Sequence, residues 1–267
     1  MANNEYYWAK KKEMAHNASH RTSMLESKYP KEIQDSFNNT RRYEGVLENI
    51  PGEAETDIKL VCFEGDSIEA VMKCREGTKA AVLNFASYKF AGGGYIAGSR
   101  AQEESLCHES FLYNVLSRFE DTYYVPNRKD VNRGLYRSKA LYSPRILFNR
   151  NTKKKYCDVI TCAAPNFSAA SKNGVSREEN NKIMRERIRF VLEIAKREKV
   201  ETLILGAWGC GVFDQDSKFV AKCFAEEIEN IMVGVKMTIV FAVIPPLPHQ
   251  ADNLKPFVEM VKDFNNK

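Results

Sequence analysis

Long apolar runs are missing from this 267-residue sequence, and none approaches the roughly 20 residues that a membrane-spanning helix needs. The first residues, MANNEYYWAKKKEMAHN, contain neither an apolar segment nor a small-residue cleavage site. We therefore expect no secretory signal, no membrane partner and a cytoplasmic location, or a nuclear one in a eukaryote. Low-complexity stretches are also few, and the balance of 43% hydrophobic to 28% charged residues is that of an ordinary globular protein.

Disulfide and metal-ligand patterns are missing as well. The seven cysteines are odd in number and include no CxxC pair. Most lie in apolar segments such as LVCF and AKCF, where a reduced cysteine behaves as a small hydrophobic residue. The four histidines do not supply the close ligand pairs of a zinc site, so we predict no metal. The net charge of +5 is compatible with a polyanionic ligand but identifies no partner by itself.

The standard nucleotide-binding motifs do not occur either. The glycine-rich segment GAWGCGVFDQD (206–216) is not followed by the Lys-Ser or Lys-Thr of a Walker A loop. Its glycine spacing also differs from GxGxxG. ATP hydrolysis and a dinucleotide redox cofactor are therefore not supported, and we expect no cofactor.

Five short apolar runs, rich in valine and isoleucine, are present instead. Such nearly continuous apolar character predicts strands that are covered on both faces. Between and after them, apolar residues recur at helical spacing. This alternation predicts an α/β fold, a three-layer α/β/α sandwich with a largely parallel sheet. The predicted strands are 58–63, 80–86, 156–164, 201–207 and 237–244, and the predicted helices are 177–198, 218–232 and 250–264.

Two segments lack this alternation. Residues 1–50 are polar and contain no convincing strand, so we interpret 1–51 as an N-terminal helical extension that ends at Pro51-Gly52. Residues 52–267 then form one α/β domain. Within it, the basic and aromatic stretch 121–155 is predicted to be a long loop or hairpin.

Ligands of such folds bind at the carboxyl ends of the strands, and polar residues follow the predicted strands there. Asp66 follows the first strand and could either cap the next helix or present a carboxylate to the amine of a nucleotide base. Asn84 closes the second strand. Both interpretations of Asp66 remain open at this point.

A glycine run and an acidic pair come after the second strand. Gly92, Gly93 and Gly94 remove every Cβ from a turn, so that backbone N–H groups can approach a phosphate closely. Seven residues later, Gln102-Glu103-Glu104 begins a helix that we expect to run to about Phe119. Two carboxylates at a helix start could also be mere partners of the helix dipole.

The loop after the fourth strand offers a second anion site. Gly209 and Gly211 precede an amphipathic helix, and a glycine loop that leads into a helix N-terminus suits a phosphate. Phe213, just beyond them, could pack in the core or against a ligand.

Taken together, these clusters resemble the macrodomain and, within it, the microbial-type poly(ADP-ribose) glycohydrolases. The GGG-x7-QEE run resembles that family's catalytic motif, and LYSPRILF (141–148) and ITCAAPN (160–166) are weaker similarities. The resemblance covers roughly residues 40 to 250, and it implies a macrodomain-like sandwich with a mixed, largely parallel sheet. One departure is Pro245-Pro246 after the last strand, where the family tends to place polar or aromatic residues near the adenine.

The resemblance also implies a role for each site residue. Asp66 would bind the adenine amine and Asn84 the distal ribose, against which Phe213 would pack. Gln102 and Glu103 would position the substrate, and Glu104 would be the general acid that protonates the ribose–ribose glycosidic oxygen. The diphosphate would lie between two loops, formed by Gly92, Gly93 and Gly94 on one side and by Gly209, Cys210, Gly211 and Val212 on the other.

Physical chemistry restricts this assignment. Neighbouring residues on a helix point about 100° apart, so Glu103 and Glu104 cannot flank one bond as an acid and base pair. One acid must therefore act nearly alone. A helix N-terminus lowers the pKa of a carboxyl group, so burial and the substrate phosphates would have to raise it.

The resemblance thus predicts a poly(ADP-ribose) glycohydrolase whose partners are poly(ADP-ribose), ADP-ribose and ADP-ribosylated proteins, with no direct binding of nucleic acid. A macrodomain reader that binds ADP-ribose without cleaving it is one alternative. The acidic pair argues against it, because binding alone needs no carboxylates beside an anionic ligand. A hydrolase of single ADP-ribose units on proteins is the other alternative, and the shared pocket leaves it open.

Overall fold

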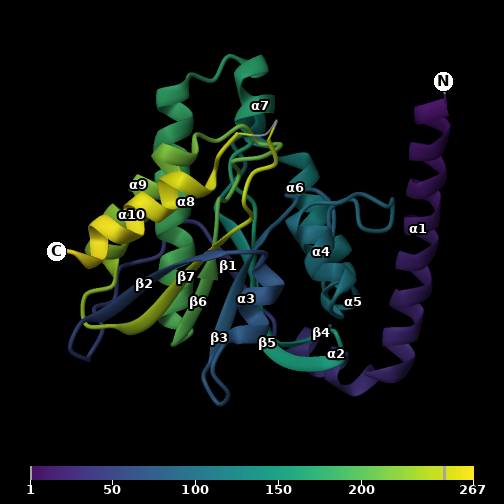
Figure 1. The fold of residues 1–267 in the computed structure, drawn as a ribbon, viewed down its shortest axis with the longest axis horizontal. Helices are drawn as coiled ribbons and strands as arrows, with labels where there is room; N and C mark the ends of the chain where they lie inside the picture. Colours follow the sequence, from purple (N-terminus) through teal and green to yellow (C-terminus); the bar gives the residue numbers. More distant parts are fainter. Residues whose placement is uncertain (1, 249–250) are drawn as a thin grey trace.

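The computed structural model describes residues 2–248 and 251–267 as a seven-stranded sheet with helices on both faces (Figure 1). The strand order is β1-β4-β5-β3-β6-β7-β2. The strands are β1 (Arg41–Glu44), β2 (Asp57–Glu64), β3 (Ala80–Phe85), β4 (Lys139–Arg150), β5 (Lys153–Cys162), β6 (Thr202–Leu205) and β7 (Lys236–Val243). The predicted α/β sandwich is therefore confirmed.

The five strands predicted from apolar runs form the parallel part of the sheet. β3 pairs in parallel with β5 and β6, and β7 pairs in parallel with β6 and β2. Their apolar side chains fill a core on each side of the sheet, because successive residues of a strand point to opposite faces. In β3, for example, Leu83 lies in one core and Val82 in the other. The parallel arrangement brings the carboxyl ends of these strands to one end of the sheet.

The prediction of no strand within residues 1–50 is wrong. Residues 41–44 form β1, which pairs antiparallel with β4 at the edge of the sheet. β4 and β5 form a hairpin with a turn at Asn151 and Thr152, so the predicted hairpin in 121–155 is confirmed but the long loop is not. The edge strand escaped prediction because its sequence, RRYE, has no apolar run: an edge strand needs none.

Three helices cover one face of the sheet, and they confirm the helices predicted from spacing: α8 (Arg177–Arg197), α9 (Ser217–Ile231) and α10 (Leu254–Asn265). The other face is covered by shorter helices and by the N-terminal segment, whose α1 runs along the outside of the molecule (Figure 1). These helices are α1 (Ala2–Lys28), α2 (Pro30–Asn38), α3 (Ser67–Lys73), α4 (Gln102–His108) and α5 (Leu112–Leu116). The short helices α6 (Val125–Lys129) and α7 (Phe167–Ala170) complete the set, with single turns at 117–119, 132–134 and 171–173 and a π-helical turn at 120–124.

The helix predicted from residue 102 to about Phe119 is interrupted. α4 ends at His108, and α5 starts at Leu112. Between them the Ser110 hydroxyl donates to the carbonyl of Leu106 (2.7 Å) and accepts from the backbone N–H of Leu112 (3.0 Å). A side chain that competes for backbone groups in this way favours a break in a helix.

The structure also bears on the cysteines and on membrane-spanning helices. All seven cysteines are free thiols, as expected. Among the residues that the structure describes, no helix is long and apolar enough to cross a bilayer.

Candidate active site

The glycine run lies directly on the acidic pair at the carboxyl end of β3. Gly93 has a φ of +60°, which disfavours any other residue, and a Cβ at this position would lie 2.6 Å from Glu104 Oε1 and 2.8 Å from Glu103 Oε2. The missing side chain therefore allows the loop to contact both carboxylates. Because both side chains lie in the first turn of α4, they reach the same glycine although they leave the helix in different directions.

Glu104 has one oxygen held and one oxygen free. Its Oε1 accepts a hydrogen bond from the backbone N–H of Gly94 (2.8 Å). Its Oε2 is buried and has no hydrogen-bond partner among residues 2–248 and 251–267. The side chain belongs to a residue that is only 7% exposed. An unpartnered buried carboxyl oxygen is an exception that calls for a functional explanation.

Both carboxylate oxygens of Glu103, by contrast, have hydrogen-bond partners. It is 3% exposed, its Oε1 accepts from Asn84 Nδ2 (3.1 Å), and its Oε2 accepts from the backbone N–H of Ser87 (2.7 Å). Burial raises the pKa of this carboxyl to about 8, the charge of Glu104 adds to the rise, and the hydrogen bonds oppose it. Burial thus outweighs the lowering of the Glu103 pKa that the hydrogen bonds cause, and it favours the protonated form of Glu103 near neutral pH.

The two residues beside the acidic pair are tied into the sheet. Asn84 contacts Thr161 Oγ1 of β5 (3.3 Å) through Nδ2, whereas its buried Oδ1 has no partner within the described part of the chain. Gln102 accepts from the N–H of Phe85 (2.9 Å) and donates to Leu83 O (2.9 Å) and Ser67 Oγ (3.1 Å). Gln102 therefore fixes the start of α4 to the end of β3.

Asp66 caps a helix, as one of its two interpretations predicts. Its Oδ1 accepts from the N–H groups of Ile68 (2.9 Å) and Glu69 (2.8 Å) at the start of α3. Both carboxylate oxygens also lie 2.8 Å from Arg150 Nη1. The cap does not remove the residue from the site, since Asp66 also lines the cavity at this end of the sheet. Its contact with an adenine amine stays a prediction.

The two glycines of the second glycine loop, Gly209 and Gly211, have different surroundings. Gly209 has a φ of +78°, and a Cβ there would lie 2.8 Å from Gln215 Cγ, so this glycine is needed for the fold. A Cβ at Gly211 would meet nothing within 4 Å, and Val212 is 83% exposed. The loop is therefore anchored at Gly209 and open at Gly211 and Val212, where a ligand could contact it.

A cavity of about 800 Å³ lies at the strand ends, between the start of α4 and the second glycine loop. The structure does not bring all predicted site residues to it: the lining residues do not include the glycine run, Asn84, Glu103, Glu104 or Phe213. Its size is in the range of small-molecule sites. Apolar residues after β7, including Ile244 and the two prolines, form one wall. Other lining residues are Asp66, Phe85, Gln102, Cys210 and Gly211. Residues that follow β2, β3, β6 and β7 are thus brought to one place.

Phe213 lies in an aromatic cluster that the sequence did not predict. Its ring is edge-on to Tyr136 (6.2 Å), and Tyr136 stacks on Tyr88 (4.5 Å), so core packing accounts for part of its role. Asn127 Nδ2 donates to Tyr88 O (3.1 Å), and Tyr124 has a buried hydroxyl without a partner among the described residues. The aromatic character of 121–155 was the only sequence signal for this group.

The helix α1 packs against the end of the glycine loop. Gly98 has a φ of +74°, and a Cβ there would lie 2.2 Å from the carbonyl oxygen of Lys11. The buried Tyr95 hydroxyl donates to Ala18 O (3.1 Å). The N-terminal segment therefore helps to hold the loop that covers the acidic pair, a contact that no sequence pattern predicted.

The fold and this site together define a macrodomain-like α/β protein with a buried acidic pair beneath a glycine loop. Residues 4–151 match the family model described as microbial-type PARG (poly(ADP-ribose) glycohydrolase), catalytic domain. The chain belongs to this family.

Solved structures agree with that assignment. The poly(ADP-ribose) glycohydrolase from Deinococcus radiodurans in complex with ADP-ribose is 31% identical, with a TM-score of 0.75 over 86% of this chain and 97% of that chain. The enzyme from Thermomonospora curvata bound to the inhibitor ADP-HPD is 25% identical, with a TM-score of 0.77 over 92% of this chain and 98% of that chain. No curated protein sequence matches the chain.

Proposed function

We propose that this chain hydrolyses the ribose–ribose O-glycosidic bonds of poly(ADP-ribose) and releases ADP-ribose, with Glu104 as the general acid. Its membership of the microbial-type PARG family and its likeness to structures with ADP-ribose and ADP-HPD support the activity. The observation that carries the assignment of Glu104 is its free Oε2, buried beneath a loop that phosphates and riboses can approach.

The chemistry follows from the state of the acidic pair. A proton on Oε2 of Glu104 passes to the glycosidic oxygen as the bond from that oxygen to the ribose carbon breaks. The ribose carbon, left with positive charge, then bonds to a water oxygen, and the proton lost by that water passes to the Glu104 carboxylate, which restores the acid. The backbone N–H of Gly94 keeps the other oxygen of Glu104 in place during this transfer.

Glu103 acts differently from Glu104 in this proposal. Both of its oxygens are occupied by the N–H groups of Asn84 and Ser87, so it has no free oxygen for the substrate. It instead orients Asn84, whose free Oδ1 can accept from a ribose hydroxyl.

The two glycine loops bind the diphosphate from opposite sides. Gly92, Gly93 and Gly94 border it on one side, although the N–H of Gly94 already donates to Glu104 and that of Gly93 to Phe90 O. On the other side, next to Cys210, the exposed backbone of Gly211 and Val212 can offer N–H groups. Asp66 lines the cavity at the strand ends, and we expect it to contact the adenine amine. Phe213 borders the distal ribose. Gln102, whose polar atoms are used within the protein, positions the substrate indirectly by holding the end of β3.

The experiment is to incubate the protein with labelled poly(ADP-ribose) and measure free ADP-ribose. We expect release by the native chain and a loss of about 10²–10⁴-fold in Glu104→Gln, which keeps the shape of the side chain but has no carboxylic proton. Binding of ADP-ribose should change little. Glu259→Gln, at an exposed carboxylate of α10, is the control and should retain full activity.

Other outcomes separate the alternatives. Binding of the polymer without release of ADP-ribose would identify a reader and overturn the proposal. Removal of single ADP-ribose units from proteins, with no cleavage of the polymer, would identify a hydrolase of the protein bond. Near-native cleavage by Glu104→Gln would show that the acid lies elsewhere.

A further inference from the structure

A second cavity, of about 520 Å³, lies at the opposite end of the sheet from the acidic pair. It is formed mainly by the residues that precede β3, by part of β4 and by the first residues of β5, whereas the cavity lined by Asp66 and Gln102, here called the catalytic cavity, follows the carboxyl ends of β2, β3, β6 and β7. Five of its eleven lining residues are lysine or arginine, and one is acidic. The cations are Arg75, Lys79, Arg145, Lys154 and Lys155.

Three of these cations are not neutralised. Arg75, Arg145 and Lys154 form no ion pair with a carboxylate among residues 2–248 and 251–267, and all three are exposed. Lys155, by contrast, pairs with Glu76 (3.1 Å). Like charges that gather around one cavity without carboxylate partners repel one another, and an anionic ligand would relieve that repulsion.

The backbone at Arg145 is built to present this side chain. β4 has a bulge between Ser143 and Ile146, and Arg145 has a φ of +56°, a conformation that costs free energy for an L-residue. Ser36 Oγ donates to Pro144 O (2.7 Å), and Asp158 Oδ1 accepts from the N–H of Arg145 (2.8 Å). The strained conformation is thus held from two sides, and bulges commonly redirect a side chain toward a functional site.

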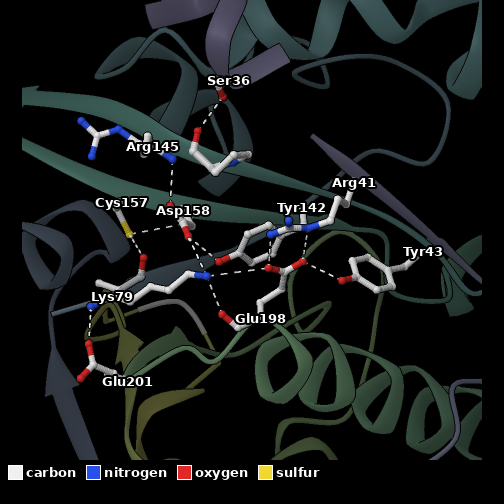
Figure 2. Close-up of polar contacts among 12 residues, drawn as sticks. Ser36, Arg41, Tyr43, Lys79, Tyr142, Arg145, Cys157, Asp158, Glu198 and Glu201 are labelled. Atoms are coloured by element: carbon white, nitrogen blue, oxygen red, sulfur yellow. Dashed lines mark hydrogen bonds and ion pairs between the residues drawn. The ribbon is translucent and has the colours of Figure 1, made fainter. Parts of the chain in front are cut away.

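A buried polar network makes this support rigid. Asp158 is 7% exposed and accepts from the hydroxyl of Tyr142, while Lys79 lies between Asp158 (4.0 Å) and Glu198 (3.7 Å). Glu198 is in turn held by Arg41 and by Tyr43 Oη (2.6 Å). In Figure 2 the guanidinium of Arg145 extends away from this network. It lies 4.5 Å from the ring centre of Tyr156, which fixes its direction.

We propose that this basic cavity is a second binding site for poly(ADP-ribose), which holds a diphosphate of the polymer away from the catalytic cavity. The inference rests on the proposed function, because it takes the polymer as the substrate. Each ADP-ribose unit carries two phosphates joined by one oxygen. Three unpaired cations around one cavity suit such a concentrated negative charge, and the proposed substrate supplies it.

A second contact would matter because the polymer is long. Once one diphosphate is held in the basic cavity, the end of the same polymer is at a high effective concentration near the catalytic cavity. Free ADP-ribose, which carries a single diphosphate, gains nothing from this linkage. The site should therefore increase the affinity for long polymer and leave the product's affinity at the catalytic cavity unchanged.

The test neutralises two of the free cations together, in Arg145→Gln/Lys154→Gln. The backbone N–H of residue 145 still donates to Asp158 in this variant. The control, Lys222→Gln/Lys262→Gln, removes the same charge from the exposed faces of α9 and α10. Each pair is measured in two backgrounds: native for steady-state hydrolysis of long polymer, and Glu104→Gln for equilibrium binding of it. Circular dichroism and the thermal midpoint establish that both variants are folded.

We expect KM for long polymer to rise by about tenfold in Arg145→Gln/Lys154→Gln, the effect of losing two exposed ion pairs, with kcat unchanged. The slope of log Kd against log salt should fall by about 1.4, at roughly 0.7 for each phosphate contact of a flexible single strand. The thermal shift caused by ADP-ribose should stay the same. The control variant should behave as the native chain.

Several results would overturn the proposal. Unchanged KM and salt slope would do so, as would equal effects in the control variant, which would indicate general charge attraction. Stronger competition by single-stranded DNA than by polymer of equal phosphate content would assign the cavity to nucleic acid. Failure of the proposed function is a separate result: the native chain would release no ADP-ribose, while the binding measurement would still report on the basic cavity.

Discussion

Gly93→Ala tests whether the glycine loop sets the position of the acidic pair. The added Cβ would lie 2.6 Å from Glu104 Oε1 and 2.8 Å from Glu103 Oε2, so both carboxylates or the loop must move. The φ of +60° adds a backbone cost of about 1–2 kcal/mol. In a domain of this size that cost lowers the thermal midpoint by about 2–8 °C. A displacement of the acid by about 1 Å should also reduce hydrolysis by about 100-fold.

Gly45→Ala separates the two effects. Gly45 has a φ of +78°, and a Cβ there would meet nothing within 4 Å, so this variant carries the backbone cost without the contact. We expect a similar decrease in the thermal midpoint, measured by differential scanning fluorimetry, and native rates of ADP-ribose release. If Gly93→Ala retains the activity of Gly45→Ala, the loop does not fix the carboxylates, and the geometric argument for Glu104 fails.

Three further predictions follow from the site. Gly211→Val should leave the thermal midpoint of the free protein unchanged, because its Cβ has open space, but should abolish the rise in midpoint that ADP-ribose causes; a normal rise would show that this loop is not a phosphate site. Folding raises the pKa of Glu103 from 4.5 to about 8, so the folded protein holds this proton more tightly than the unfolded chain does. The contribution of Glu103 to the free energy of unfolding is therefore complete below about pH 4.5 and is lost as the pH rises toward 8, by at most about 1.4 kcal/mol per pH unit. Urea unfolding at pH 5 and pH 7.5 should show this decrease in the native chain and a smaller one in Glu103→Gln; equal decreases would contradict it. Tyr95→Phe removes the hydrogen bond to Ala18 O and should cost about 1 kcal/mol and part of the activity, whereas an unchanged rate would mean that α1 does not support the loop.

The sequence predicted the buried parts of the fold better than the exposed ones. The strand 80–86 could be recognised because a strand covered by helices on both faces must be apolar throughout. β1 could not, since an edge strand exposes its side chains, and RRYE looks like any polar segment. The break at Ser110 was equally hidden, because it depends on a hydroxyl that bonds to its own backbone rather than on a proline or glycine.

Among the site residues too, those that depend on local contacts were predicted and those that depend on distant contacts were not. The glycine run and Gln102-Glu103-Glu104 were found from the sequence, because their spacing reflects one local contact. The raised pKa of Glu103 and the free oxygen of Glu104 were not predictable, since they depend on how deeply the loop from residue 87 to 94 covers them. Nor was the position of Arg145 predictable: it requires Asp158 and Ser36, which lie far from it in sequence.

The packing of α1 on Gly98 has a consequence for how this protein is handled. If residues 1–51 are regarded as an extension that can be removed, a shortened protein that starts near Pro51 still contains the whole catalytic motif. Such a version would lose the helix that covers Tyr95 and Gly98, and it would leave a buried tyrosine facing water beside the glycine loop. The contacts come from the middle of α1, at Lys11, Ala15 and Ala18, so a shortened version that starts after these residues would lose the same support. Low activity from either preparation would then reflect a loosened loop rather than the native enzyme.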